Sequence, residues 1–69
     1  MKELQVVLNG NEEILENTMN LSEFLSFKGL NPETIIVELN GKIIKKTEWN
    51  QTILQDKDCL EVLKFVGGG

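Results

Sequence analysis

Three stretches of the chain alternate between apolar and polar residues, which is the pattern of a strand with one buried face. They are residues 4–8, 34–39 and 59–66. The apolar positions on their expected inner faces are Leu4, Val6, Leu8, Ile35, Val37, Leu39, Leu60 and Val62. The alternation therefore predicts strands that share one core.

Two Asn-Gly pairs follow the first two of these stretches. Asn and Gly tolerate the positive φ angles of a tight hairpin turn, so Asn9-Gly10 and Asn40-Gly41 predict hairpins. The returning strands are expected at residues 12–16 and 42–45. In the first of them either Ile14 or Leu15 faces inward, depending on the loop length, because a one-residue slip reverses the faces. The sequence alone leaves this choice open.

One helix is expected between the hairpins, over residues 21–28. Asn20 is a suitable N-cap, and Glu23 follows at the spacing of a capping box. The apolar residues at helical spacing are Leu21, Phe24 and Leu25. Phe27 flanks this stripe and is expected to cover the sheet edge, and Gly29 is expected to end the helix.

The segment after the second hairpin is predicted to be irregular. Over residues 47–54 one helical turn is expected around Trp49, before Ile53 or Leu54 returns to the core. Asp56-Lys57-Asp58 is typical of a turn, and turn chemistry explains its two carboxylates better than catalysis or metal binding.

The resulting order is strand, strand, helix, strand, strand, turn, strand, which predicts an α+β fold. One helix laid across one mixed five-strand sheet is the economical way to bury both apolar faces. The first and last strands are expected to pair in parallel at the centre, since the long crossover between them permits it. We therefore predict one domain over residues 1–66 and a flexible glycine tail over residues 67–69.

Composition narrows the possible functions. The 69 residues carry a net charge of −4, contain no His, and include seven basic residues that are all Lys. His, the usual general base and metal ligand, and Arg, which binds phosphate through two hydrogen bonds, are both absent. We therefore expect no enzyme activity from the chain itself and no metal site. Acidic charge without a basic stripe argues against nucleic-acid binding and fits better with a locally basic protein partner.

The expected cellular location of the protein follows from the sequence features that it lacks. No apolar run approaches the roughly 20 residues of a membrane helix, and no signal peptide is visible, so we expect no membrane association. The single Cys59 predicts a reducing, cytoplasmic setting, and without a His to activate it we expect it to be inert.

The sequence ends in an apolar strand that runs directly into three glycines, Phe65-Val66-Gly67-Gly68-Gly69. Glycine has no Cβ atom, so such a tail can pass through a narrow channel with its α-carboxylate leading. A terminal glycine run is also common as a frayed end or a cloning remnant. The strand leading into the tail favours the interpretation that a folded body holds out the carboxylate.

Taken together, these residues resemble the ThiS family, the sulfur carrier proteins of thiamine biosynthesis, which have a ubiquitin-like β-grasp fold. The resemblance spans essentially the whole chain. Lys57 departs from it, because the family commonly has Gly between the two acidic residues. The matching segments are Leu8-Asn9-Gly10, residues 21–25, residues 37–41, Trp49, Leu54, Asp56, Asp58 and residues 61–69.

The resemblance implies a function for the tail. A partner similar to ubiquitin-activating enzymes would use ATP to adenylate the Gly69 carboxylate, and cysteine-derived sulfur would displace AMP to leave a thiocarboxylate. Thiazole synthase would then take this sulfur. Gly67 and Gly68 would serve as the threading segment, and the chain itself would bind no cofactor.

Two alternatives remain. The small subunit of molybdopterin synthase has the same fold and terminal chemistry, but that family typically ends with prolines and a Ser before the diglycine, where this chain has Phe65-Val66-Gly67. A ubiquitin-like binding module or modifier would instead form isopeptide bonds through the tail.

A docking surface is expected on the sheet face away from the helix, because alternation leaves apolar residues there and exposed apolar clusters commonly mark interfaces. It would comprise Ile36, Leu63 and Phe65 with Val7 beside them. Glu38 and Glu61 would form an acidic rim facing a basic partner.

Overall fold

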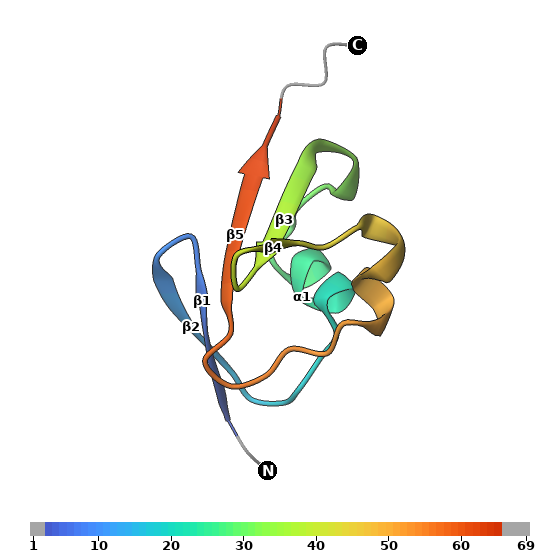
Figure 1. The fold of residues 1–69 in the computed structure, drawn as a ribbon. Helices are drawn as coiled ribbons and strands as arrows, with labels where there is room; N and C mark the ends of the chain where they lie inside the picture. Colours follow the sequence, from blue (N-terminus) through green and yellow to red (C-terminus); the bar gives the residue numbers. More distant parts are fainter. Residues whose placement is uncertain (1–2, 66–69) are drawn as a thin grey trace.

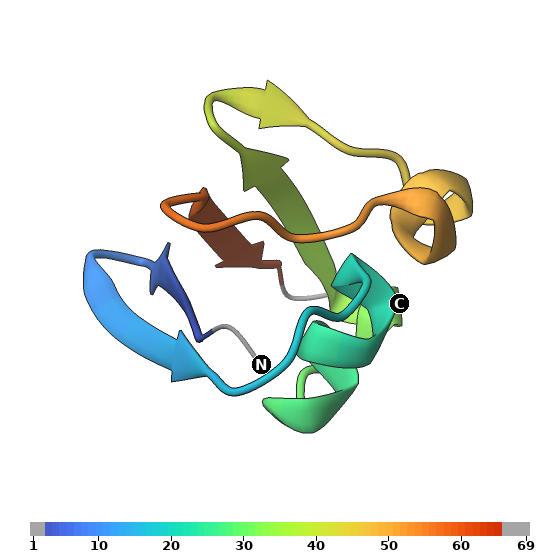
Figure 2. The same cartoon turned by 90° about the horizontal axis from the view of Figure 1, so that it is seen from below.

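A five-strand mixed sheet and one helix form the two layers of the molecule in the computed structural model, which describes residues 3–65 (Figures 1 and 2). The strands are β1 (Leu4–Leu8), β2 (Asn11–Leu15), β3 (Ile35–Leu39), β4 (Lys42–Ile43) and β5 (Cys59–Lys64). The helix is α1 (Leu21–Phe27), and short 3₁₀ segments occur at Pro32–Thr34 (η1) and Lys46–Gln51 (η2).

The sheet has the order β2-β1-β5-β3-β4, with β5 at its centre. β1 and β5 pair in parallel, and the other neighbours are antiparallel. The predicted α+β architecture and the central parallel pair are confirmed. The predicted boundary between domain and tail, at residues 66 and 67, lies outside the described residues.

Both Asn-Gly pairs form the predicted turns. Asn9 and Gly10 have φ angles of 51° and 85°, and Asn40 and Gly41 have φ angles of 53° and 85°. Positive φ at both central residues defines the type I′ turn, whose twist suits a two-residue hairpin.

The first turn settles the register of β2. Leu8 pairs with Asn11, so the loop has two residues, and Leu4 pairs with Leu15. Leu15 is therefore the inward residue at 4% exposure, whereas Ile14 is 57% exposed.

The Asn side chains of the two turns also hold β5 from both sides. Asn9 Oδ1 accepts a hydrogen bond from the Val62 N–H at 2.8 Å, and Asn9 Nδ2 donates to the Val62 carbonyl at 3.3 Å. On the other side, Asn40 Oδ1 accepts from the Cys59 N–H at 2.9 Å. The turn residues thus extend the backbone ladder along the strand that leads to the tail.

We expect Asn9→Gly to lower the free energy of unfolding by about 1–3 kcal/mol, because the part-buried Val62 backbone loses its partners. Glycine keeps the positive φ that the turn needs, so the loss reports the side chain rather than the turn. Urea unfolding followed by Trp49 fluorescence measures it, with Asn11→Gly as the control for an added glycine beside the turn. Equal stability of wild type and Asn9→Gly would contradict the assigned role.

α1 begins and ends as its sequence predicts, within one residue. The Glu23 N–H donates to Asn20 Oδ1 at 2.8 Å, and the Asn20 N–H donates to Glu23 Oε1 at 3.0 Å, which completes the capping box. At the other end, Gly29 has a φ of 74° and the Leu30 N–H donates to the Leu25 carbonyl at 3.0 Å, a Schellman motif. The helix ends at Phe27 rather than residue 28 because Lys28 is its C-cap.

The core lies between α1 and the inner sheet face. Its buried apolar residues are Val6, Leu15, Leu21, Phe24, Leu25, Ile35, Val37, Trp49, Leu54, Leu60 and Val62. Trp49 enters from η2 and donates from Nε1 to the Ile44 carbonyl at 3.0 Å, so its polar atom is satisfied. Leu54 is fully buried and Ile53 is 48% exposed, which settles the second choice left open by the sequence.

The acidic turn before β5 is structural, as predicted. Asp58 is buried, and its carboxylate accepts from the Gln55 N–H at 2.8 Å and from Asn40 Nδ2 at 3.0 Å. Asp56 Oδ1 accepts from the Gln5 N–H at 2.8 Å. Lys57 between them has a φ of 71°, a left-handed conformation that favours glycine.

Lys57→Gly is expected to stabilise the fold by about 0.5–1 kcal/mol. A left-handed non-glycine residue costs about 1–2 kcal/mol, and the greater unfolded-state freedom of glycine offsets only part of this. Lys57→Ala is the matched control: it removes the same charge but keeps a Cβ atom. Thermal unfolding should show a higher Tm for Lys57→Gly alone, and an equal rise in both variants would attribute the effect to charge.

Candidate functional site

β5 carries the chain from the centre of the sheet to its C-terminal tail. The Phe65 N–H donates to the Thr34 carbonyl at 2.9 Å, which continues the β3–β5 ladder one residue beyond the strand. The backbone is therefore fixed up to Phe65. The predicted carboxylate-bearing Gly69 and the predicted threading residues Gly67 and Gly68 lie outside the described residues.

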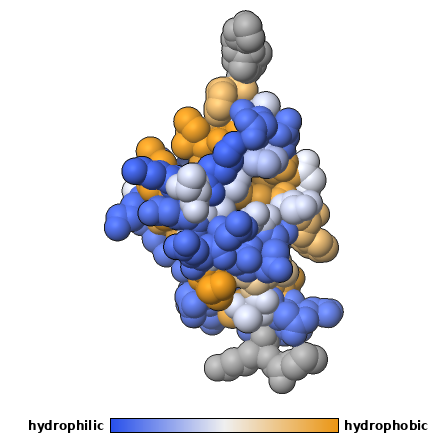
Figure 3. Space-filling model, turned by 90° about the vertical axis from the view of Figure 1, so that its right-hand side faces the viewer, coloured by the Kyte–Doolittle hydropathy of each residue, from blue (hydrophilic) through white to orange (hydrophobic). Residues whose placement is uncertain are grey.

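Three of the predicted docking residues come together on the outer face of the sheet. Ile36 and Leu63 are directly opposite each other on β3 and β5, and are 42% and 57% exposed. Phe65 follows two positions after Leu63 on the same face and is 45% exposed. We refer to Ile36, Leu63 and Phe65 as the apolar patch. Figure 3 shows hydrophobic side chains gathered at the end of the molecule where β5 finishes.

Val7 lies on the same face but apart from the patch. It pairs with Cys59, four residues before Leu63, which corresponds to about 13 Å along a strand. The sequence placed Val7 beside the patch because alternation gives the face of a residue but not its position along a neighbouring strand.

Two glutamates separate these positions. Glu38 on β3 and Glu61 on β5 are directly opposite each other, immediately before the Ile36–Leu63 pair along the sheet. Neither belongs to the ion pairs found within residues 3–65, which join Lys28 to Glu13 and Lys46 to Glu33. Like charges opposite each other on a sheet are unfavourable. A basic group of another protein placed here would reduce the repulsion between the two carboxylates.

Ile43 was not predicted from the sequence as part of this surface. This residue is 62% exposed on β4 and pairs with Glu38, so it borders the acidic pair on the side away from β5. Its strand has only two residues, which is too short for an alternation signal.

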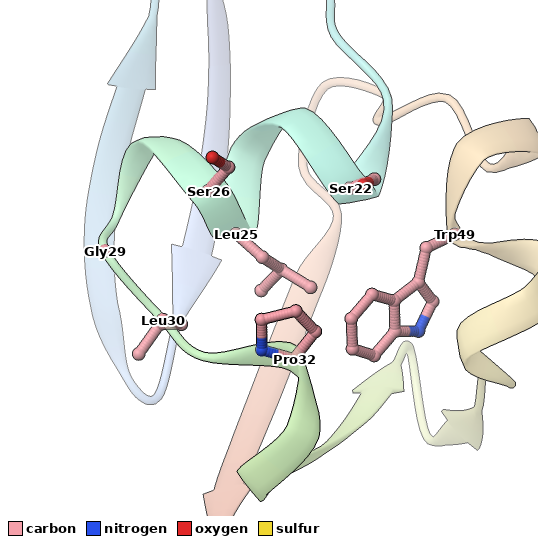
Figure 4. A pocket seen from close by; sticks show the side chains of 7 residues that line it. All are labelled: Ser22, Leu25, Ser26, Gly29, Leu30, Pro32 and Trp49. Carbon is pink, nitrogen blue, oxygen red and sulfur yellow. The ribbon is translucent and has the colours of Figure 1, made fainter.

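A hollow of about 450 Å³ lies in the helix layer (Figure 4). The side chains of Leu25, Pro32 and Trp49 converge in it, with Ser22 and Ser26 on the adjoining α1. None of its seven lining residues is titratable, so it offers apolar contacts and hydroxyls but no acid–base chemistry.

The other reactive or metal-binding side chains do not form a site in the described part of the chain. Cys59 is an exposed free thiol on the outer face, opposite Val7. Within residues 3–65, no three His, Cys, Asp or Glu side chains gather in the manner of metal ligands. No helix in this part of the chain is both long and apolar enough to span a membrane.

Comparison with known proteins decides the family. The model of the ThiS family matches residues 2–69, which is nearly the whole chain. The chain belongs to the ThiS family. It is 35% identical over 63 residues to the sulfur carrier protein ThiS of Bacillus subtilis (strain 168), covering 90% of this chain and 96% of that protein.

Solved structures place this ThiS-family chain in the ubiquitin-like β-grasp fold, as the sequence resemblance implied. The crystal structure of the thiamine biosynthesis protein ThiS from Geobacter metallireducens superposes with a TM-score of 0.82 at 32% identity, covering 96% of this chain and all of that one.

A different kind of relative is much longer. A thiazole synthase of Paramagnetospirillum magneticum (strain ATCC 700264 / AMB-1) is 32% identical over 66 residues. The match covers 96% of this chain but spans only 20% of the thiazole synthase.

Proposed function

We propose that this chain carries sulfur as a thiocarboxylate on Gly69 and donates it for thiazole formation in thiamine biosynthesis. The observation that carries the proposal is that the match to the ThiS family model extends through the last residue of the glycine tail. The fold contributes a rigid body that is hydrogen-bonded up to Phe65, four residues before the terminal carboxylate.

The chemistry requires activation first, because a carboxylate is a poor electrophile. A Gly69 carboxylate oxygen attacks the α-phosphate of ATP and pyrophosphate leaves, which gives an acyl adenylate. The terminal sulfur of a cysteine-derived persulfide then attacks the carbonyl carbon and AMP leaves. A thiol cleaves the S–S bond of the resulting acyl disulfide, which releases the thiocarboxylate and leaves a disulfide on the donor. These steps belong to partner enzymes, and the chain supplies the carboxylate and its position.

The acyl adenylate must be kept from water, so the tail has to enter a closed site. Gly67 and Gly68 suit this passage because neither has a side chain to accommodate. Four extended residues reach at most about 14 Å. The adenylating site of the partner therefore lies within that distance of the surface that holds Phe65.

The apolar patch is proposed to dock this partner. Its members are exposed, central on the sheet and adjacent to the start of the tail. The opposed Glu38 and Glu61 would receive a basic group of the partner, which favours fast and specific association. Contact with Val7 as well would require a partner that extends about 13 Å along the outer face.

Thiazole synthase is proposed as the recipient of the sulfur. The support is that a segment similar to this whole chain occurs within proteins named thiazole synthase, including one from Magnetococcus marinus (strain ATCC BAA-1437 / JCM 17883 / MC-1) at 32% identity over 66 residues. The setting proposed for these steps is the cytoplasm.

The experiment follows the tail product. The chain is incubated with ATP, cysteine and the adenylating and desulfurase enzymes of its host, and then with either thiazole synthase or the large subunit of molybdopterin synthase. We expect a thiocarboxylate that is consumed by thiazole synthase only. A lysine conjugate would indicate a protein modifier, and consumption by the molybdopterin synthase subunit alone would assign the other carrier role.

A further inference from the structure

A second surface lies at the edge of the sheet, formed by β2 and the end of α1. It contains a hollow of about 330 Å³ lined by Ile14, Leu15, Glu16, Asn17, Met19 and Phe27. Phe27 was expected to cover this edge, but it is 73% exposed and stands beside it, while Ile14 is 57% exposed. The two side chains flank the edge from opposite faces of the sheet, because Ile14 pairs with Gln5 on the outer face and Phe27 belongs to the helix layer. Exposed apolar side chains on both sides of one edge favour a partner that covers it.

The same edge presents backbone groups for pairing. Among residues 3–65, no strand pairs with the side of β2 that faces away from β1. On β1, the Val7 N–H donates to the Asp58 carbonyl at 2.9 Å and the Gln5 carbonyl accepts from the Lys57 N–H at 2.6 Å. Both residues thus direct their backbone groups away from β2.

The direction of the β1 backbone groups determines which N–H and C=O groups of β2 are available to pair with an added strand. Val7 pairs with Glu12 and Gln5 pairs with Ile14, so both are non-hydrogen-bonded pairs of the antiparallel ladder. The N–H and C=O groups of Glu12 and Ile14 therefore point outward from the sheet. A strand added here would find donors and acceptors in the ordinary spacing of a sheet.

The negative charge along this edge favours a basic segment over a second copy of the chain. Glu13 is paired with Lys28, with Oε1 and Nζ 3.0 Å apart, whereas Glu12 and Glu16 are exposed at the two ends of the edge. A second copy of the chain paired through β2 would bring these glutamates together, and like charges across a sheet are unfavourable. An extended segment with Lys or Arg near its ends would be attracted instead.

We propose that the β2 edge and its hollow form a docking groove for an extended basic segment of another protein. About five residues would add to the sheet as a sixth strand beside β2. One apolar side chain of the segment would lie beside Leu15 and Phe27 in the hollow on the helix side, and the next would lie beside Ile14 on the outer face. Its cationic ends would meet Glu12 and Glu16.

The groove is separate from the apolar patch. Leu15 lies beside Leu4, at the start of β1, whereas the patch lies at the end of β5, which runs parallel to β1 (Figure 1). A basic segment can therefore remain bound while the tail engages a partner. This proposal does not depend on what the tail carries.

The test uses a short synthetic peptide with a valine–isoleucine centre and lysine pairs at both ends. N-methylation of alternate central residues leaves one edge able to pair and prevents self-association. We expect saturable amide shift changes at residues 12–16 and Phe27, and slower hydrogen exchange at the Glu12 and Ile14 N–H groups. The chain lacking residues 67–69 should bind equally well.

Neutral substitutions locate the contact. Ile14→Ser and Phe27→Ser are each expected to weaken binding about tenfold. Ile43→Ser is the matched control, because it removes an exposed isoleucine from the opposite edge strand, β4. Trp49 fluorescence and the amide spectrum establish that each variant is folded.

Several outcomes would overturn the proposal. They are shift changes centred on β4 or on the outer face, equal binding of a peptide with glutamate ends, no saturable binding of the lysine peptide, and a concentration-dependent dimer formed through β2.

Discussion

Deletion of Gly69 is expected to lower ATP–pyrophosphate exchange with the adenylating partner by at least about 100-fold. The terminal carboxylate would stop one residue short, about 3.3–3.6 Å from its required place. A misplacement of ~1 Å can already cost about 100-fold in rate, so the shortened tail should be inactive. The core residues lie between Val6 and Val62, so thermal stability should not change.

Variants with a tail of unchanged length distinguish the position of the carboxylate from the passage of the tail into the closed site of the partner. Gly68→Ala and Gly68→Val retain the terminal carboxylate but add side chains of increasing size, and exchange should fall in that order. A C-terminal amide should abolish exchange by removing the reacting group while adding no bulk. Wild-type exchange by the Gly69 deletion, with sulfur still loaded, would refute the carrier role of the tail.

The double variant Leu63→Asp/Phe65→Asp is expected to bind the adenylating partner at least about 100-fold more weakly. Two interface residues of this kind commonly contribute about 2 kcal/mol each when they sit at the centre of a contact. Both side chains are exposed, so the free energy of unfolding of the double variant should lie within about 1 kcal/mol of the wild-type value. This is the range that differences in strand propensity cover. Isothermal titration and urea unfolding measure the two quantities.

The control carries the same added charge elsewhere. Gln51→Asp/Ile53→Asp alters two exposed residues near η2, away from the patch, and should bind the partner as wild type does. Equal weakening in both double variants would indicate a general effect of the added charge rather than loss of the apolar patch. An unfolded Leu63→Asp/Phe65→Asp variant would show that these side chains support the fold, and unchanged binding would place the docking surface elsewhere.

Local signals in the sequence determined most of the fold. The Asn-Gly turns and the Asn20–Glu23 capping box depend on residues a few positions apart, so their geometry follows from local chemistry. The faces of β1 and β5 followed from alternation for the same reason.

Choices that depend on distant contacts were not determined. Ile14 and Leu15 differ only in which of them meets the core, and the register with β1 decides this. Ile53 and Leu54 present the same difficulty after an irregular segment. In both cases two neighbouring apolar residues compete for one inward position.

The candidate site was predictable in part. Alternation identified the exposed face of Ile36 and Leu63 but not the distance of Val7 from them, because the offset between β1 and β5 is set by the whole crossover. The groove beside β2 was missed, since an edge strand and a helix end meet there only in the folded chain. The role of the glycine tail stays a prediction, because residues 66–69 lie outside the part of the chain that the structure describes.

The measurement that tests the central claim most directly is the intact mass of the chain after incubation with ATP, cysteine and its adenylating and desulfurase partners. The account predicts replacement of one oxygen by one sulfur, located by fragmentation on the segment that ends in Gly69 and formed equally in Cys59→Ser. An unchanged mass despite ATP consumption, or sulfur found on Cys59 instead, would contradict it.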